Sequence, residues 1–455
     1  MNDRAASIAI IGGGVAGLVA AYRLLQQGHT VQIFEAGPAV GGLVRTFEPG
    51  GDRLECFYHH LFTSDGAAIR LLDELDLLKT LTWRRSRVGI FYNDRLYPFT
   101  STLDLMKFTP LLGIRDRIRF GLLALDLRRR RDASAFDEVT AMEWLRRNAG
   151  QRALDVVWEP LLRGKFGEMA DKVSMAWLWN RVSVRFSSRG ILSQTEVLGY
   201  QIGSFAVWIE ALVKLISALG EISTNEPVDR VVNTGARLRL DTASGPSHDF
   251  DAVIATTGKS AFMRIAPPLG DEYTERLKSI KYQDAVCLVL SLKESLSDFY
   301  WVNINDRSIP FVAVVEHTNL IERERYNGQH IVYISNYVSE GSDLAQMNAD
   351  EVFSLYEPHL KRINHAFDRS WVNNRWLFQA AEAQPVFTVG AASRIADHRT
   401  PIRGLYLANM AQIYPQDRGQ NQSILLGEKI AAIVAADMSE AEVDERLGLR
   451  GPLEK

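Results

Sequence analysis

The sequence feature that most constrains the fold lies near the N-terminus, where a short apolar run leads directly into a turn rich in glycine. Residues 7–11 (SIAII) are almost all apolar, which is typical of a central parallel strand covered on both faces. The turn at 12–17 (GGGVAG) is followed by helical apolar spacing over 18–27 and by a second apolar run at 31–35. This order predicts a strand, a turn, a helix and a strand, which form a dinucleotide-binding Rossmann unit.

The glycines and one acidic residue of this unit indicate its ligand. Gly12 permits the tight turn, Gly14 lets the backbone approach a pyrophosphate, and Gly17 allows close packing of the helix on the strand. The helix N-terminus attracts the phosphate charge. Glu35 ends the second strand about 20 residues beyond the glycines, where a carboxylate binds ribose hydroxyls and disfavours a 2′-phosphate. A glycine-rich connection without a ligand is the alternative, but the complete order of elements favours FAD or NAD.

A second segment selects FAD. Residues 35–46 (EAGPAVGGLVRT) resemble the extended fingerprint of the flavin amine oxidase superfamily. In that superfamily a glycine pair, here Gly41 and Gly42, passes close to the dinucleotide, and a basic residue, here Arg45, lies near the pyrophosphate or the flavin. An ordinary surface charge is the alternative for Arg45. The two cysteines lie outside the segments matched to the flavin ring, so we expect the FAD to be bound non-covalently.

Two later segments extend the resemblance to the same superfamily. Residues 404–409 form an expected buried strand, and 420–432 form an expected helix whose N-terminal amides, in the superfamily, point at the flavin pyrimidine. Between the two ends of the chain, 226–231 and 251–256 resemble the middle FAD segment, in which the backbone of a valine, here Val228, meets the adenine. The motif and the resemblance together imply a set of cofactor-binding residues: Gly12, Gly14, Ala16, Gly17, Glu35, Ala36, Gly41, Gly42, Arg45, Val228, Asn409, Asp417 and Gln422.

The separation of these matches predicts a discontinuous FAD domain. The chain has 455 residues, too many for one ordinary core, so we expect two or three packed units. The expected fold class is α/β, a Rossmann-type doubly wound FAD domain with an inserted α+β substrate domain. The substrate domain should be mainly helical in its first part and mainly antiparallel sheet in its second. The expected bounds are 1–65, 205–273 and 390–440 for the FAD domain, 66–204 and 274–389 for the substrate domain, and 441–455 for a C-terminal tail.

Further segments resemble particular branches of the superfamily. Residues 58–63 (YHHLFT), 158–167 (WEPLLRGKFG) and 199–205 (GYQIGSF) look like protoporphyrinogen-oxidase-like and phytoene-desaturase-like members. The same segments, with 311–317, are also similar to UDP-galactopyranose mutase, in which reduced FAD attacks a sugar with no net redox change. Residues 414–419 (YPQDRG) are closer to the oxidase-like pattern.

This comparison ranks three hypotheses for function. The first is an FAD-dependent oxidoreductase, an oxidase or desaturase, that removes hydride from a small organic or isoprenoid-like substrate. The second is a redox-neutral mutase that acts on a nucleotide sugar. The third is an FAD-binding protein without catalysis.

Candidate catalytic residues follow from side-chain chemistry. His59 and His60 are candidate proton carriers because imidazole titrates near neutral pH, and a structural histidine is the alternative for either. Arg163, Lys165 and Arg185 are candidates for an anion site that binds a phosphate, a diphosphate or a carboxylate. A solvated helix face is the alternative for these three. The spacing of potential ligands predicts no metal site.

Charge and hydropathy limit the partners. The net charge of −3 lacks the footprint of a nucleic-acid binder, so we expect a small-molecule substrate, either lipid-like or phosphorylated. Two isolated cysteines fit a reducing cytoplasm, and the sequence has neither a signal-peptide pattern nor an apolar run of the roughly 18 residues that cross a membrane. Residues 103–127 mix large apolar and basic residues and lead into four arginines at 128–131. This pattern predicts peripheral contact with a membrane surface, or else a helical core with a solvated basic end. The sequence carries no signal for an oligomeric state.

Overall fold

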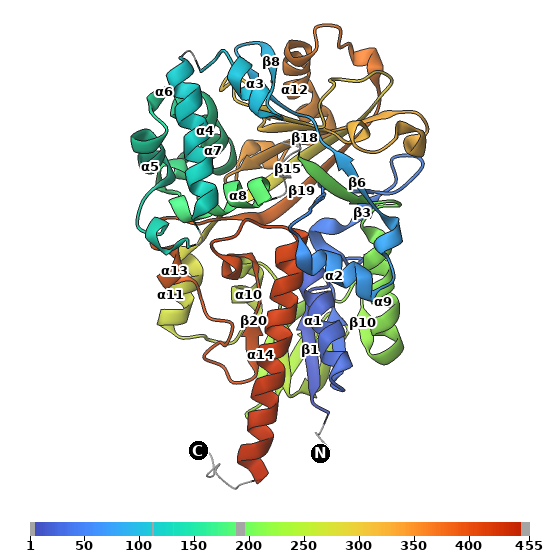
Figure 1. The fold of residues 1–455 in the computed structure, drawn as a ribbon. Helices are drawn as coiled ribbons and strands as arrows, with labels where there is room; N and C mark the ends of the chain where they lie inside the picture. The colour runs from blue at the N-terminus through green and yellow to red at the C-terminus, as the bar shows by residue number, and fades with distance from the viewer. Residues whose placement is uncertain (1–4, 112, 131, 188–195, 447–455) are drawn as a thin grey trace.

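The chain folds into two lobes, one above the other in Figure 1. The structure is a computed structural model that describes residues 5–111, 113–130, 132–187 and 196–446.

The lower lobe is built on a five-stranded parallel sheet. Its strand order is β10-β2-β1-β14-β20, and every neighbouring pair is parallel. The five strands are β1 (Ser7–Ile11), β2 (Thr30–Phe34), β10 (Glu221–Ser223), β14 (Ala252–Ala255) and β20 (Leu405–Leu407). The central strands are almost wholly apolar because both faces of the sheet are covered. Each of the three segments expected to build the FAD domain contributes at least one strand.

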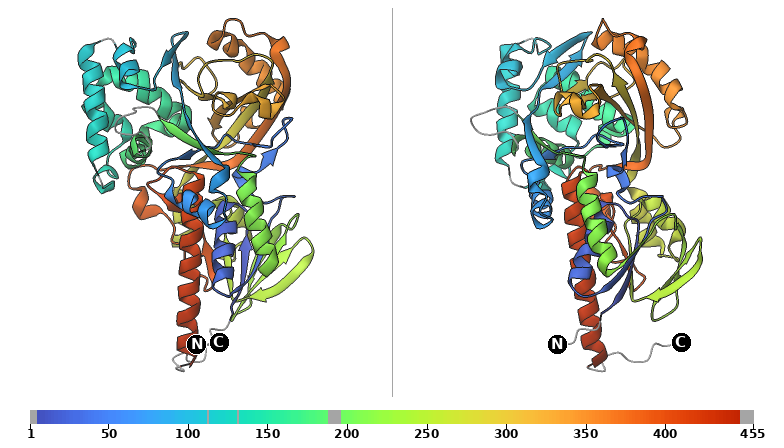
Figure 2. Two further views of the ribbon diagram at one scale, coloured as in Figure 1. Left: turned by 45° about the vertical axis from the view of Figure 1, so that its right-hand side comes forward. Right: turned by 90° about the vertical axis from the view of Figure 1, so that its right-hand side faces the viewer.

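Different elements cover the two faces of this sheet. One face packs in a common core with three helices, α1 (Val15–Gln26), α9 (Ala206–Leu219) and α14 (Gln420–Arg446), and Figures 1 and 2 show α14 running beside α1. The other face packs on an antiparallel sheet and two helices. These are β11 (Val228–Asn233), β12 (Leu238–Thr242), β13 (Gly245–Phe250), α10 (Lys259–Ile265) and α11 (Asp271–Ser279). The doubly wound α/β fold expected from the sequence is therefore confirmed.

The upper lobe contains a seven-stranded sheet of order β19-β15-β18-β17-β16-β7-β8, in which only the β16 and β7 pair is parallel. Helix α12 (Ala349–Ile363) packs on one of its faces. The strands are β7 (Val88–Tyr92), β8 (Arg95–Pro98), β15 (Lys281–Leu292), β16 (Trp301–Ile304), β17 (Ala313–Glu316), β18 (His330–Val338) and β19 (Val372–Val386).

A group of helices with its own core lies beside this sheet (Figure 2). They are α3 (Thr102–Lys107), α4 (Ile114–Arg129), α5 (Ala141–Asn148), α6 (Gln151–Ala153), α7 (Glu159–Phe166) and α8 (Met175–Ser187). The expected helical part at 66–204 also contains strands, because β7 and β8 extend the large sheet by pairing with β16. Local periodicity could not predict a strand whose partner lies about two hundred residues away in the sequence.

Short elements complete the chain, several of them between the lobes. They are α2 (Gly66–Glu74), α13 (Ala391–Arg394), the pair β3 (Thr46–Phe47) and β4 (Leu54–Glu55), and the sheet of β5 (Leu61–Phe62), β6 (Leu81–Arg85) and β9 (Val197–Gln201).

Candidate active site

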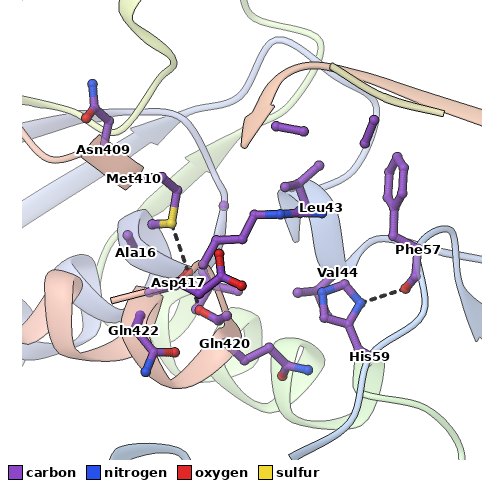
Figure 3. Close-up of a pocket in the computed structure, with 18 of the residues that line it drawn as sticks. Ala16, Leu43, Val44, Phe57, His59, Asn409, Met410, Asp417, Gln420 and Gln422 are labelled. Carbon is purple, nitrogen blue, oxygen red and sulfur yellow. Dashed lines mark hydrogen bonds between the residues drawn. The ribbon is translucent and has the colours of Figure 1, made fainter. Parts of the chain in front are cut away.

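A cavity of about 400 Å³ is lined by residues of both lobes (Figure 3). The lower lobe contributes the N-terminal glycine turn and the segment before α14. The upper lobe contributes residues from α7, α8, β15, β18 and β19. A ligand in this cavity would therefore contact the Rossmann unit and the inserted domain at once.

The glycine turn has the shape that a bound pyrophosphate requires. Gly12 adopts a φ of +106°, and a Cβ atom on Gly17 would lie 2.1 Å from the carbonyl oxygen of Gly12, so neither position accepts a side chain without strain. A Cβ atom on Gly14 would meet no atom within 4 Å. Gly14 and Ala16 line the cavity at the N-terminus of α1, where the first amides of the helix lack partners within the helix.

The carboxylate of Glu35 braces this turn. Its two oxygens accept hydrogen bonds from the backbone N–H groups of Gly13, at 2.7 Å, and Gly37, at 2.8 Å. A contact between Glu35 and ribose hydroxyls stays a prediction.

Of the predicted cofactor residues, seven line the cavity: Gly14, Ala16, Gly41, Gly42, Asn409, Asp417 and Gln422. The other six lie outside its lining: Gly12, Gly17, Glu35, Ala36, Arg45 and Val228. The side chain of Arg45 is exposed, and Val228 is buried at the start of β11.

The segment from β20 to α14 forms another wall of the cavity. Asn409 begins a helical turn at Met410–Ile413, and its side chain accepts a hydrogen bond from the Ala411 N–H. Helix α14 begins at Gln420, three residues after Asp417, and Gln422 lies in its first turn. The glycine turn near the N-terminus and the segment before α14 therefore meet at the cavity, although they are far apart in the sequence.

Asp417 is the centre of a buried charged cluster. Its carboxylate accepts from Lys165 Nζ at 2.7 Å, from the guanidinium of Arg181 and from Trp177 Nε1 at 3.2 Å. Burial raises the pKa of Asp417, but the ammonium of Lys165 and the guanidinium of Arg181 outweigh it and hold this pKa well below its usual range. Burial lowers the pKa of Lys165 to about 8, although Asp417 opposes the change.

A tyrosine completes this cluster on the side of the upper lobe. Tyr337 lies on β18, and its hydroxyl oxygen accepts a hydrogen bond from Arg418 at 2.9 Å. Lys165 Nζ lies 5.4 Å from the centre of the same ring. Burial raises the pKa of Tyr337, but Arg418 and Lys165 lower it more, to about 8.

Both candidate histidines line the cavity. His59 donates from Nδ1 to the carbonyl oxygen of Phe57 at 2.6 Å, and burial lowers the pKa of His59 to about 4 (Figure 3). His59 is therefore neutral near pH 7. His60 Nδ1 lies 3.0 Å from the hydroxyl of Tyr300, a contact in which either group is the donor.

The predicted anion site is rearranged. Arg163 lies outside the lining of the cavity and binds Glu159, at 2.7 Å, and Asp171, at 3.1 Å. The side chain of Arg185 lies outside the described residues. Instead, Lys165 shares the carboxylate of Asp417 with Arg181 and faces the ring of Tyr337 together with Arg418.

Helix geometry explains why the structure separates Arg163 from Lys165. Residues two apart on a helix point to nearly opposite sides, so Lys165 faces the cavity while Arg163 faces solvent. Trp177 and Arg181 are four residues apart on α8 and share one face, and this spacing is the signal that could have identified Arg181. Tyr337 gave no local signal, because its neighbours come from other elements.

Known proteins resemble this chain in sequence and in fold. A family model described as flavin containing amine oxidoreductase matches residues 15–416. A coproporphyrinogen III oxidase of Staphylococcus aureus is 23% identical over 289 residues, which cover 56% of this chain and 61% of that protein. The chain thus spans less than two thirds of this curated relative.

Solved structures resemble nearly the whole chain. An oxidoreductase from Methanosarcina mazei matches with a TM-score of 0.72 at 19% identity. The match covers 93% of this chain and 99% of the oxidoreductase chain. A reduced UDP-galactopyranose mutase matches with a TM-score of 0.71 at 17% identity. The match covers 98% of this chain and 94% of the mutase chain. At such identities the likeness establishes the fold alone.

Proposed function

This chain belongs to the family of flavin-containing amine oxidoreductases, and from that premise we propose that it oxidises a small organic molecule by passing hydride to FAD. The observation that carries the proposal is the shared cavity. One side of it is formed by the glycine turn of the Rossmann unit, and another by side chains of the inserted domain. A substrate held by the inserted domain would therefore lie against a dinucleotide held by the turn.

The residues of the cavity fit FAD. The open space at Gly14 leaves room for a pyrophosphate beside the N-terminus of α1, and the N-terminus of α14 supplies further unpaired amides. Gly41 and Gly42 line the cavity next to this turn, and the carboxylate of Glu35 lies at the end of β2. When bound, the flavin supplies the acceptor for the hydride of the substrate.

The chain's own residues would orient the substrate. Lys165, Arg181 and Arg418 place three cations beside the single carboxylate of Asp417. This local excess of positive charge favours a substrate that carries a phosphate or a carboxylate, and disfavours a cationic amine. Guanidinium groups bind such anions through paired N–H donors, so Arg181 and Arg418 would fix the orientation of the substrate.

The inserted domain also offers a surface for a lipid bilayer. Helix α4 is apolar on two sides: Phe120, Leu123 and Leu127 are buried in the helical core, and an opposite set is exposed. The exposed set, together with two residues of α3, forms what we call the outer face: Leu103, Met106, Ile114, Ile118, Leu122 and Leu125. These six are a majority of the eleven large apolar side chains that are exposed in the described ranges, so the outer face is a concentrated patch.

Positive charge borders the outer face. Lys107, Arg115 and Arg129 are exposed on α3 and α4. Exposed apolar side chains with basic neighbours match the chemistry of an anionic membrane surface. We therefore propose peripheral binding to anionic lipid, which suits a lipid-like substrate. Of the arginine run at 128–131, Arg131 and the side chain of Arg128 lie outside the described residues. No helix in the described part of the chain is long and apolar enough to span a bilayer.

Anaerobic spectroscopy separates oxidation from the redox-neutral alternative, which has the same fold. The purified protein with oxidised FAD should be bleached by its substrate alone, and an added acceptor should restore the colour. A mutase would be active only with flavin that is already reduced, and would consume no further reductant. Efficient formation of the furanose from UDP-galactopyranose by the dithionite-reduced protein would overturn the proposed oxidation.

A further inference from the structure

Tyr337 has surroundings unlike those of the other tyrosines of the cavity. Its hydroxyl lies in the cavity lining and accepts the N–H of Arg418, and its ring is faced by two cations, with Lys165 Nζ 5.4 Å and Arg418 Cζ 5.5 Å from its centre. Tyr58 and Tyr282 also line the cavity, but burial raises the pKa of both. A guanidinium that donates to the phenol oxygen stabilises the phenolate and leaves the neutral phenol less favoured.

The groups that act on Tyr337 come from several elements. Arg418 and Lys165 favour its phenolate from the segment before α14 and from α7. Asp417 opposes them, but it is already bound by Lys165 and Arg181. Burial, and after it the neighbouring Tyr337, raises the pKa of Tyr58 well above its usual value. The balance of these charges leaves one ionisable phenol in the cavity, at Tyr337.

We propose that Tyr337 accepts the proton that the substrate loses during oxidation. This role rests on the proposed oxidation by FAD. This step requires a substrate with a C–H bond next to an N–H or O–H group. The C–H bond would break with its electron pair, which bound FAD would accept as hydride, and the neighbouring N–H or O–H would give its proton to the phenolate oxygen of Tyr337. A double bond forms between the two substrate atoms, and the proton later passes from Tyr337 to water.

Other bases in the cavity are less suited to this step. His59 uses Nδ1 to bind Phe57, and burial lowers its pKa to about 4, so it holds a proton poorly at neutral pH. Asp417 is a still weaker base because two cations bind it. Glu382 accepts hydrogen bonds from the backbone N–H and the hydroxyl of Ser260, which direct its carboxylate toward the start of α10. Lys165 has a pKa similar to that of Tyr337, about 8, but its ammonium is bound to both carboxylate oxygens of Asp417. Burial raises the pKa of Asp65 to about 6, and its carboxylate accepts the backbone N–H of Phe62. An effective proton acceptor has a pKa near the working pH, and Tyr337 combines such a pKa with a hydroxyl in the cavity lining.

The first test needs no substrate. The FAD-loaded protein is titrated with base while the ultraviolet absorbance of phenolate is recorded. Wild type should ionise one tyrosine with a midpoint of about 8. Tyr337→Phe should lack this transition, and Arg418→Gln should shift it to higher pH. The matched control is Tyr22→Phe, because the hydroxyl of Tyr22 binds Glu74 outside the cavity lining and its pKa is raised, by burial first. A transition that survives in Tyr337→Phe overturns the proposal.

The second test uses the rate at which substrate bleaches the flavin. In wild type and in Tyr22→Phe the rate should rise with pH and level off above a midpoint of about 8. In Tyr337→Phe it should fall by roughly 10² to 10⁴-fold, the usual effect of losing a positioned base, and lose this pH dependence. Equal rates in wild type and Tyr337→Phe would remove the role of Tyr337 while leaving the oxidation intact. A wild type that no candidate substrate bleaches would overturn the proposed function itself.

Discussion

A Cβ atom on Gly17 would lie 2.1 Å from the carbonyl oxygen of Gly12, whereas a Cβ atom on Gly14 would meet nothing within 4 Å. Glycines of one turn thus serve different purposes. Gly17 is required by the packing of α1 on its own turn, and Gly14 leaves space that only a ligand would use.

Gly14→Val should therefore give a folded protein that is purified without flavin. Gly14 has a φ of −71°, which valine adopts, and the new side chain enters the space reserved for the pyrophosphate. The flavin content is measured by absorbance and the fold by thermal unfolding. Gly17→Ala is the contrasting variant and should lower the free energy of unfolding by about 1 to 3 kcal/mol, the usual effect of overpacking. Full flavin occupancy in Gly14→Val would separate the glycine turn from cofactor binding.

The FAD should leave the protein when the chain is denatured with acid. Cys56 and Cys287 are buried and do not line the cavity, so neither thiol is placed to form a covalent bond to the flavin. After precipitation and centrifugation, the yellow colour should be in the supernatant. Colour retained in a washed pellet would contradict non-covalent binding.

Inorganic pyrophosphate should compete with the substrate of the FAD-loaded protein through the cationic cluster. Arg181→Gln should weaken its inhibition of flavin bleaching by about 10-fold, because a hydrogen bond to a charged group contributes about 1.5 to 3 kcal/mol. Arg163→Gln is the matched control, since Arg163 lies outside the cavity lining and is bound to Glu159 and Asp171. Equal weakening by both variants would show that the effect is not local to the cavity.

The outer face should determine sedimentation with vesicles. Replacing Ile118 and Leu122 with serine should reduce binding to vesicles of anionic phospholipid, because each large apolar side chain that enters a bilayer contributes about 1.5 to 3 kcal/mol. The matched control replaces Leu215 and Leu219 with serine as well. Both leucines are exposed on α9 in the lower lobe. Equal sedimentation of the two double variants would rule out the outer face as the membrane surface.

The arginine run should add an electrostatic attraction to vesicles of anionic lipid, and this attraction should depend on the salt concentration. If arginines 128 to 131 meet anionic lipid, each contributes about 1 kcal/mol, and added salt weakens the attraction. Glutamine at all four positions should therefore reduce sedimentation at low salt and have less effect at high salt. No change in sedimentation at low salt would indicate a merely solvated basic end.

Burial of Glu55 should make stability depend on pH. Tyr200 and the backbone N–H of Phe205 donate to its carboxylate, at 3.0 and 2.7 Å, yet burial raises the pKa of Glu55 to about 7. The folded state then binds the proton more tightly than the unfolded state, whose pKa is near 4.5. The contribution to stability is present below that value and is lost as pH rises through about 7, at no more than about 1.4 kcal/mol per pH unit. Urea unfolding should show this slope in wild type and a flatter one in Glu55→Gln.

The sequence predicted those parts of the fold that depend on neighbouring residues. The strand, glycine turn and helix of the Rossmann unit follow one another along the chain, so local periodicity was sufficient. The helix expected over 420–432 continues as α14 to Arg446, because residues 433–446 contain no glycine or proline.

The chemistry of the site could be predicted only in part. Lys165 and Asp417 are 252 residues apart in the sequence and meet only through the packing of the two lobes. The sequence singled out both residues but did not pair them, and it missed Arg181 and Tyr337. Tyr337 acquires its chemistry from Arg418 and Lys165, neither of which is near it in the sequence.

The order of the segments around the cavity also decides when the cofactor can be taken up. The glycine turn is synthesised before β20 and α14, which complete its sheet and close one wall of the cavity. A nascent chain on the ribosome therefore carries the phosphate-binding turn without the rest of its pocket. Flavin loading should therefore follow synthesis of α14, so growth under riboflavin limitation should accumulate apoprotein that contains α14 rather than shorter arrested intermediates.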